Sequence, residues 1–142
     1  MNLKKLVKEL NKVFNEWGIR FNTEIKRTDS GEKVQATANL TLKGADDDIY
    51  ADFNFYPNGV CQYLFTFDKL AKTPKTLDLV NTFNEEALWF KAFIDDKFLR
   101  LSHIMLNMTE DMVAVYTDRV LDNLTDDDLK EYLLPLTRLT EE

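Results

Sequence analysis

The spacing of hydrophobic residues changes early in the chain and predicts one helix followed by several strands. In residues 2–17 leucine, valine and aromatic residues recur at i, i+3, i+4 and i+7, which is typical of an amphipathic helix, and Gly18 follows at the C-cap position. From Ile19 onward apolar and polar residues alternate, which indicates strands with one buried face. Turn residues, including Asn58-Gly59, divide this region into four strands near 19–26, 33–43, 48–56 and 60–67.

A second helix and two unusually apolar strands follow. Pro74 fits the first position of a helix that extends to about Ala87. Residues 88–94 and 98–108 are apolar at nearly every position, so we expect two strands that are covered on both faces or lie at an interface.

Helix signals return near the C-terminus. Thr109 is expected to cap a third helix, and residues 124–128 restart a fourth that Pro135 kinks or ends. The order α-β-β-β-β-α-β-β-α-α predicts an α+β fold in which helices pack on an antiparallel sheet, as one domain over residues 1–142.

Charge is distributed unevenly along the chain. Residues 1–108 hold 15 basic and 15 acidic residues, whereas residues 109–142 hold three basic and ten acidic ones, so the net charge of −7 belongs to the last quarter. This balance opposes nucleic-acid binding, which needs a positive surface. No apolar run reaches the roughly 18 residues of a membrane span, and the charged N-terminus does not read as a secretory signal. We therefore expect a cytoplasmic protein that does not enter a membrane.

Candidate catalytic and metal-binding groups are sparse. His103, the single histidine, lies within an apolar strand, and Cys61 follows a hairpin turn without a neighbouring base, so we expect structural roles for both. The aspartate runs 46–48 and 126–128 lack the spacing of a calcium loop, and phosphate-binding glycine loops are absent. No catalytic residue, metal or cofactor is predicted.

Aromatic and aliphatic side chains concentrate in residues 88–108, and this region is our candidate protein interface. Helices are expected to cover only one of its faces, so we predict a homodimer through this side of the sheet. The predicted interface residues are Trp89, Phe90, Phe93, Phe98, Leu101 and Ile104. The alternative is that the third helix folds over this region through Met112, Val113, Tyr116, Val120, Leu121 and Leu124.

The order of elements, together with LVNTFN at 79–84 and WFKA at 89–92, resembles the YbjN-type family of bacterial sensory transduction regulators. The fold of that family is similar to that of type III secretion chaperones. The resemblance covers nearly the whole chain, although four strands precede the second helix where three are expected. It implies a non-enzymatic binding or regulatory role, often as a dimer, and supplies no catalytic residue.

The sequence therefore predicts a non-enzymatic, chaperone-like module that binds another protein. A second hypothesis is a small enzyme or ligand-binding protein that uses carboxylates on the polar strand faces, such as Asp52, Asp48 and Glu24. A third is an accessory protein of a phage or mobile element.

Overall fold

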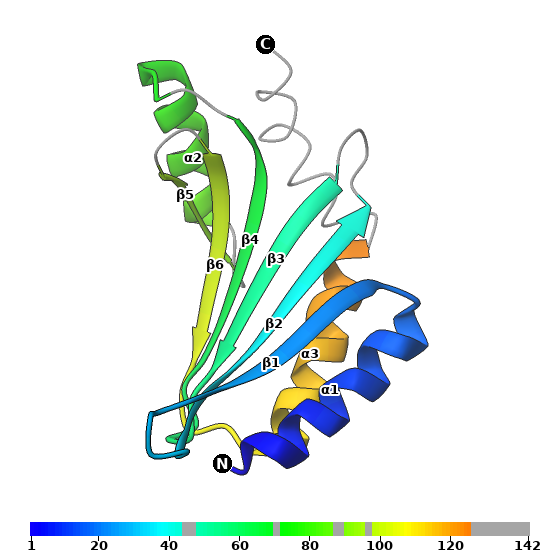
Figure 1. Ribbon diagram of the computed structural model, residues 1–142. Coiled ribbons are helices and arrows are strands. Elements are labelled where there is room, and N and C mark those ends of the chain that lie inside the picture. Colours follow the sequence, from blue (N-terminus) through cyan, green and yellow to red (C-terminus); the bar gives the residue numbers. More distant parts are fainter. Residues whose placement is uncertain (44–47, 70–71, 87–89, 96–97, 126–142) are drawn as a thin grey trace.

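The computed structural model describes residues 1–43, 48–69, 72–86, 90–95 and 98–125 (Figure 1). The N-terminal part contains α1 (Leu3–Trp17), β1 (Arg20–Arg27), β2 (Lys33–Lys43), β3 (Asp48–Phe55) and β4 (Cys61–Lys69). The C-terminal part contains α2 (Pro74–Glu86), β5 (Lys91–Asp95), β6 (Phe98–Met105) and α3 (Glu110–Thr125). The predicted α+β class is confirmed, and the predicted fourth helix falls outside the described residues.

The six strands form one sheet in the order β1-β2-β3-β4-β6-β5, with every neighbouring pair antiparallel. Directly opposed residues point to the same side of a sheet, so each cross-strand row belongs to one face. The row that defines the outer face runs through Arg20, Thr41, Tyr50, Thr66, Arg100 and Phe93. The neighbouring row defines the inner face and runs through Phe21, Leu40, Ala51, Phe65, Leu101 and Ala92.

The described helices cover the inner face, and no described helix lies on the outer face. In Figure 1, α1 and α3 lie side by side: α1 contacts β1 and β2, and α3 meets β4 and β6 through Thr117 and Tyr116, whereas α2 lies at the β5–β6 edge. Aromatic rings fill the layer beneath α1 and α3: the ring of Phe53 lies 4.7 Å from that of Tyr63 and 6.4 Å from that of Phe14 in α1. All three side chains are fully buried, so this layer is the centre of the hydrophobic core.

The predicted first helix is confirmed by its stripe and its caps. Leu3, Leu6, Leu10 and Phe14 are buried along one side of α1. The Oδ1 atom of Asn2 accepts a hydrogen bond from the backbone N–H of Lys5 at 3.1 Å, and Gly18 ends the helix in a left-handed conformation with φ of 66°.

Helix α2 is bonded to the edge of the sheet through a side-chain amide. The Nδ2 group of Asn84 donates to the carbonyl oxygen of Ala92 at 2.9 Å, and the backbone N–H of Ala92 donates to Asn84 Oδ1 at 2.7 Å. Asn84 thus satisfies both backbone groups of Ala92 that face away from β6. The buried Val80 and Phe83 give α2 an apolar side next to this amide.

The β3–β4 turn is held tightly against the segment that connects β6 to α3. The backbone N–H of Met108 donates to the carbonyl oxygen of Gly59 at 2.9 Å, and the preceding Asn107 has a φ of 57°. A Cβ atom on Gly59 would lie 2.9 Å from the backbone nitrogen of Met108. The N-terminus joins the same region, because the Met1 ammonium bonds the Pro57 carbonyl and the Asn2 N–H bonds the Glu110 carboxylate.

The two apolar strands are shorter than the sequence predicts, and they have only one buried face. The strand predicted over 88–94 is β5, which begins at Lys91, while residues 87–89 fall outside the described residues. Along β5 buried residues alternate with exposed ones, and β6 ends at Met105 rather than at Met108 because the chain turns at Asn107. No described element covers the outer side of these strands, so the expectation that both of their faces are covered is not met. The alternative expectation, that they lie at an interface, stays a prediction.

Gly59 provides a test of the packing between the β3–β4 turn and the β6–α3 connection. Gly59→Ala is expected to lower the free energy of unfolding by roughly 1–3 kcal/mol, because alanine disfavours a φ of 86° and its methyl group meets the Met108 backbone. Urea unfolding of the variant and of wild type measures this loss.

Gly31→Ala is the matched control, since Gly31 has a φ of 87° with no atom within 4 Å of the added carbon. We expect Gly31→Ala to lose clearly less stability than Gly59→Ala. Equal losses at the two positions would show that the close approach to Met108 contributes nothing.

Candidate functional site

The structure separates the predicted interface residues between the two sides of the sheet. Phe90 and Leu101 are buried in the inner-face core, whereas Phe93, Phe98 and Ile104 lie on the outer face. Trp89 falls outside the described residues. Phe90 and Leu101 therefore belong to the core of this chain, and of the five described members only Phe93, Phe98 and Ile104 are accessible to a partner.

Charged residues interrupt the apolar outer surface of β5 and β6. Phe93 stands between Lys91 and Asp95 along β5, and Arg100, its cross-strand neighbour, lies 3.6 Å from the Asp95 carboxylate. Ile104 lies beyond Ser102 on the same face of β6. The outer face of these strands thus offers separated apolar side chains.

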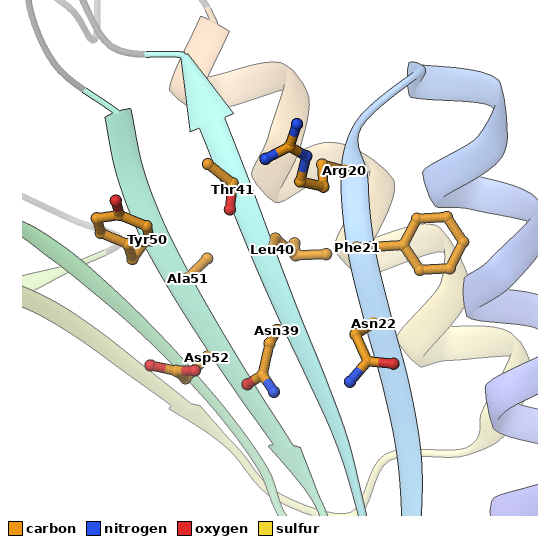
Figure 2. A pocket seen from close by; sticks show the side chains of 9 residues that line it. All are labelled: Arg20, Phe21, Asn22, Asn39, Leu40, Thr41, Tyr50, Ala51 and Asp52. Atoms are coloured by element: carbon orange, nitrogen blue, oxygen red, sulfur yellow. The ribbon is translucent and has the colours of Figure 1, made fainter.

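The other half of the outer face is polar and slightly hollowed (Figure 2). A recess of about 250 Å³ lies over β1, β2 and β3, where two cross-strand rows of polar side chains meet the solvent. These side chains belong to Arg20, Asn22, Asn39, Thr41, Tyr50 and Asp52. The recess is open to the solvent rather than enclosed, and Figure 2 shows its polar side chains spread over three strands.

The carboxylates predicted for an enzyme share the outer face but do not converge. Asp52 pairs with Asn39 across β2 and β3, whereas Glu24 pairs with Thr37 across β1 and β2. One strand, β2, lies between Glu24 on β1 and Asp52 on β3, and these two strand spacings set their backbones roughly 10 Å apart across the sheet before the offset along the strands is added. Asp48 lies at the start of β3, opposite Lys43. Only Asp52 lines the recess.

His103 belongs to an aromatic cluster on the inner face. It stands opposite Tyr63 on β4, and its ring stacks on that of Tyr116 with centroids 5.6 Å apart and an interplanar angle of 24°. The Phe90 ring lies 6.1 Å from the His103 ring on another side. These ring contacts agree with the structural role predicted for His103.

Two tyrosines in this cluster are held in their neutral forms. Burial raises the pKa of Tyr63 far above its usual range, and the hydrogen bond with Thr117 only partly opposes this effect. The two hydroxyl oxygens, both fully buried, are 3.0 Å apart. Burial also raises the pKa of Tyr116 to about 12. Neither phenol is therefore suited to act as a base near neutral pH.

A methionine-rich groove beside α3 was not predicted from the sequence. Its apolar lining comes from the end of β6 and from one side of α3, and its volume is about 400 Å³. We use the name methionine groove for the site formed by Met105, Met108, Met112, Val115 and Tyr116, with Asp111 and Arg119 at its margins.

The exposed members of the groove come from the side of α3 that faces away from the core. Met112 is 49% exposed and Val115 is 58% exposed, whereas Val113, Val120 and Leu121 are buried. The alternative in which the third helix folds over residues 88–108 is supported by Tyr116, which stacks on His103 of β6, but it is wrong for Met112, because α3 turns Thr117 rather than Met112 toward the sheet. The spacing of Met108, Met112 and Val115 is the signal that could have revealed a second apolar stripe.

Among the described residues, no three His, Cys, Asp or Glu side chains gather in a way that could hold a metal ion. The described helices are also too short or too polar to cross a membrane.

The Cys61 thiol is fully buried, and burial raises its pKa from 9.0 to about 12. Because the thiolate is the reactive form, native protein at pH 8 is expected to resist iodoacetamide, whereas urea-unfolded protein is expected to be alkylated. Mass spectrometry of both samples measures the modification. Rapid alkylation of the native state would contradict the burial of Cys61.

The same shift predicts how stability changes with pH. Between about pH 9 and about pH 12 the unfolded chain loses the Cys61 proton while the folded chain retains it, so the free energy of unfolding should fall as pH rises. Urea unfolding at pH 8, 9.5 and 11 measures this fall, which should be shallower in Cys61→Ala. An equally steep fall in the variant would assign the pH dependence to other groups.

No protein-family model and no curated protein matches the chain, so the resemblance to the YbjN-type family stays a prediction. Among solved structures, the chain is similar to the crystal structure of the Yersinia pestis type III secretion chaperone SycH in complex with a stable fragment of YscM2. The two chains are 11% identical, the match covers 82% of this chain and 94% of that chain, and the TM-score is 0.42.

Proposed function

We propose that this protein is a non-enzymatic protein-binding module and that the methionine groove is its binding surface. The observation that carries the proposal is the exposure of Met112 and Val115 beside an open apolar groove. Exposed apolar surface is unfavourable by about 25 cal/mol per Å², and contiguous patches of it commonly mark interaction sites.

The composition of the groove favours a protein ligand. Three of the four methionines of the chain line it, and the unbranched, polarizable methionine side chain adapts to partners of different shape. Leu106, next to Met105 in the chain, is 64% exposed and extends the apolar character of this end of β6, whereas Ile104 lies on the opposite, outer face.

The shape of the groove favours a helix as the bound element. One wall is the exposed side of α3, so a second helix can lay its apolar side chains between Met112, Val115 and the end of β6. A bound amphipathic helix would remove these side chains from water and keep its own polar side exposed.

The positions of the reactive groups support a non-enzymatic role. Cys61 is a buried, neutral thiol, and His103 is stacked on Tyr116 within the inner-face cluster. Asp52 lines the outer-face recess without a second carboxylate beside it. The described residues thus place none of the predicted candidates in an arrangement for acid–base or nucleophilic chemistry.

The outer-face recess favours a second candidate function, the binding of a small polar ligand. None of its six polar side chains makes a hydrogen bond to another described side chain, so their donors and acceptors face the solvent. We rank this candidate second because the recess is open to the solvent and its apolar members, Phe21, Leu40 and Ala51, belong to the inner face.

The proposal predicts that partner capture depends on Met112. Tagged wild type added to an extract of its native cells should retain a reproducible set of proteins at physiological salt, and Met112→Glu should lose that set. The substitution is at an exposed position, so the free energy of unfolding should change by less than about 0.5 kcal/mol.

Tyr50→Glu is the matched control, because Tyr50 is as exposed as Val115 but lies on the outer face. It should retain the same proteins as wild type. Retention of an unchanged set by Met112→Glu, or loss in Tyr50→Glu alone, would contradict the groove as the binding surface.

A further inference from the structure

We propose that the helix seated in the methionine groove is α3 of a second copy of this chain, packed antiparallel to the first. This inference rests on the proposed function, because it names the partner that occupies the same surface. Apolar and charged residues are arranged symmetrically around Val115 on the exposed side of α3.

The exposed side of α3 has the symmetry that a homodimer requires. Asp111 and Arg119 lie four residues before and four residues after Val115, about one helical turn on each side, and both line the groove margin. A two-fold axis beside Val115 therefore places Asp111 of each copy opposite Arg119 of the other. Two identical pairs of opposite charge form at once, which is the reciprocity of an isologous interface.

The centre of this arrangement is apolar, because Asp118, the one other charged residue between Asp111 and Arg119, is directed to α1, where it accepts a hydrogen bond from Trp17 Nε1 at 2.7 Å. Met112 and Val115 lie between the two charges on the exposed side of α3, and Val115 would meet its own counterpart at the axis. Val113 and Thr117 are buried on the opposite side, so pairing through the exposed stripe leaves the contacts of α3 with its own sheet unchanged. Apolar centres with charged margins are typical of stable interfaces.

Asp111 and Arg119 can form new ion pairs with a second copy at little cost. Asp111 lies 4.0 Å from Lys5 Nζ, but both side chains are more than half exposed, and exposed ion pairs contribute little to stability. Arg119 forms no ion pair with any described residue. A helix from an unrelated protein would need a matching basic residue and acidic residue two turns apart, whereas a second α3 carries both.

The interface first predicted from the sequence is the rival site for a dimer. Its accessible members on the outer face are Phe93, Phe98 and Ile104, and Lys91, Asp95 and Arg100 lie among them. On the outer face of β5, Lys91 and Asp95 also lie symmetrically about Phe93, but Asp95 is already paired with Arg100 at 3.6 Å, and Phe93 is only 38% exposed, less than Met112 or Val115. We therefore assign the dimer to α3.

Sedimentation equilibrium of the purified chain tests the assignment by exchange of the two charges. The apparent mass of the wild-type protein is expected to rise with concentration from the 16.6 kDa of one chain toward twice that value. Asp111→Arg and Arg119→Asp should each raise the dissociation constant of the dimer at least about tenfold. Each substitution places two like charges opposite one another in both of the symmetry-related pairs. The double variant D111R/R119D should restore the dissociation constant to within about threefold of wild type, because it exchanges the charges and keeps the pairs.

Two further variants make the result specific. Asp78→Arg changes the net charge by the same amount as Asp111→Arg, but on α2, which lies away from α3 (Figure 1). It should leave the dissociation constant of the dimer unchanged. Phe93→Asp alters the rival site on the outer face and should also leave the dimer intact. Circular dichroism of each variant verifies that the fold is retained.

Three results would overturn the inference. The first is a monomer at every concentration up to about 500 μM. The second is a dimer that both single charge variants leave unchanged, or that the double variant fails to restore. The third is a dimer that Phe93→Asp dissociates while the charge variants do not. If the chain is monomeric but Met112→Glu still loses captured proteins, the proposed function stands and only the second copy is excluded.

Discussion

The hydrogen bond between the hydroxyl groups of Tyr63 and Thr117 determines how α3 lies on the sheet. Both residues are fully buried and are 54 positions apart in the chain, and the two oxygens are 3.0 Å from each other. Either hydroxyl without its partner would be a buried, unsatisfied polar group, which is unfavourable by roughly 1–3 kcal/mol. A rotation of α3 about its axis would break this bond, so one orientation of the helix is favoured over its neighbours.

The orientation of α3 in turn decides which apolar side chains reach the solvent. With Thr117 against Tyr63, the buried side of the helix holds Val113, Val120 and Leu121, and Met112 and Val115 point away from the core. The methionine groove therefore follows from a polar contact inside the protein. The ring of Tyr116 contacts both regions: its centroid lies 5.6 Å from that of the buried Tyr63, and it also lines the methionine groove.

The sequence predicts the first four strands and α1 closely, because each has a regular pattern and a clear boundary. The alternation in 33–43 coincides with β2, and the apolar stripe of residues 2–17 coincides with α1. Prediction was poorer where apolar residues are continuous, since a run such as 88–94 does not show which of its faces is covered. Only the pairing of β5 with β6 assigns Phe93 to the outer face and Ala92 to the inner face.

The site was less predictable than the fold for the same physical reason. Helix α3 carries apolar residues on two sides, and periodicity alone does not distinguish the stripe that is buried from the one that is exposed. The choice depends on Thr117, a polar residue that no hydrophobic pattern places in a core. The register between β4 and β6, which sets His103 opposite Tyr63, likewise depends on contacts between segments distant in the chain.

The amide of Asn84 affects how copies of this chain can meet through their backbones. A sheet grows by strand addition when a free edge offers its N–H and C=O groups to another strand, and an open-ended polymer needs two such edges on every copy. Asn84 occupies both groups of Ala92, the second residue of β5, so a new strand cannot pair with this position without first breaking two hydrogen bonds. The opposite edge, β1, can then pair only with another β1, which closes after two copies. A single side-chain amide thereby hinders head-to-tail growth into fibrils.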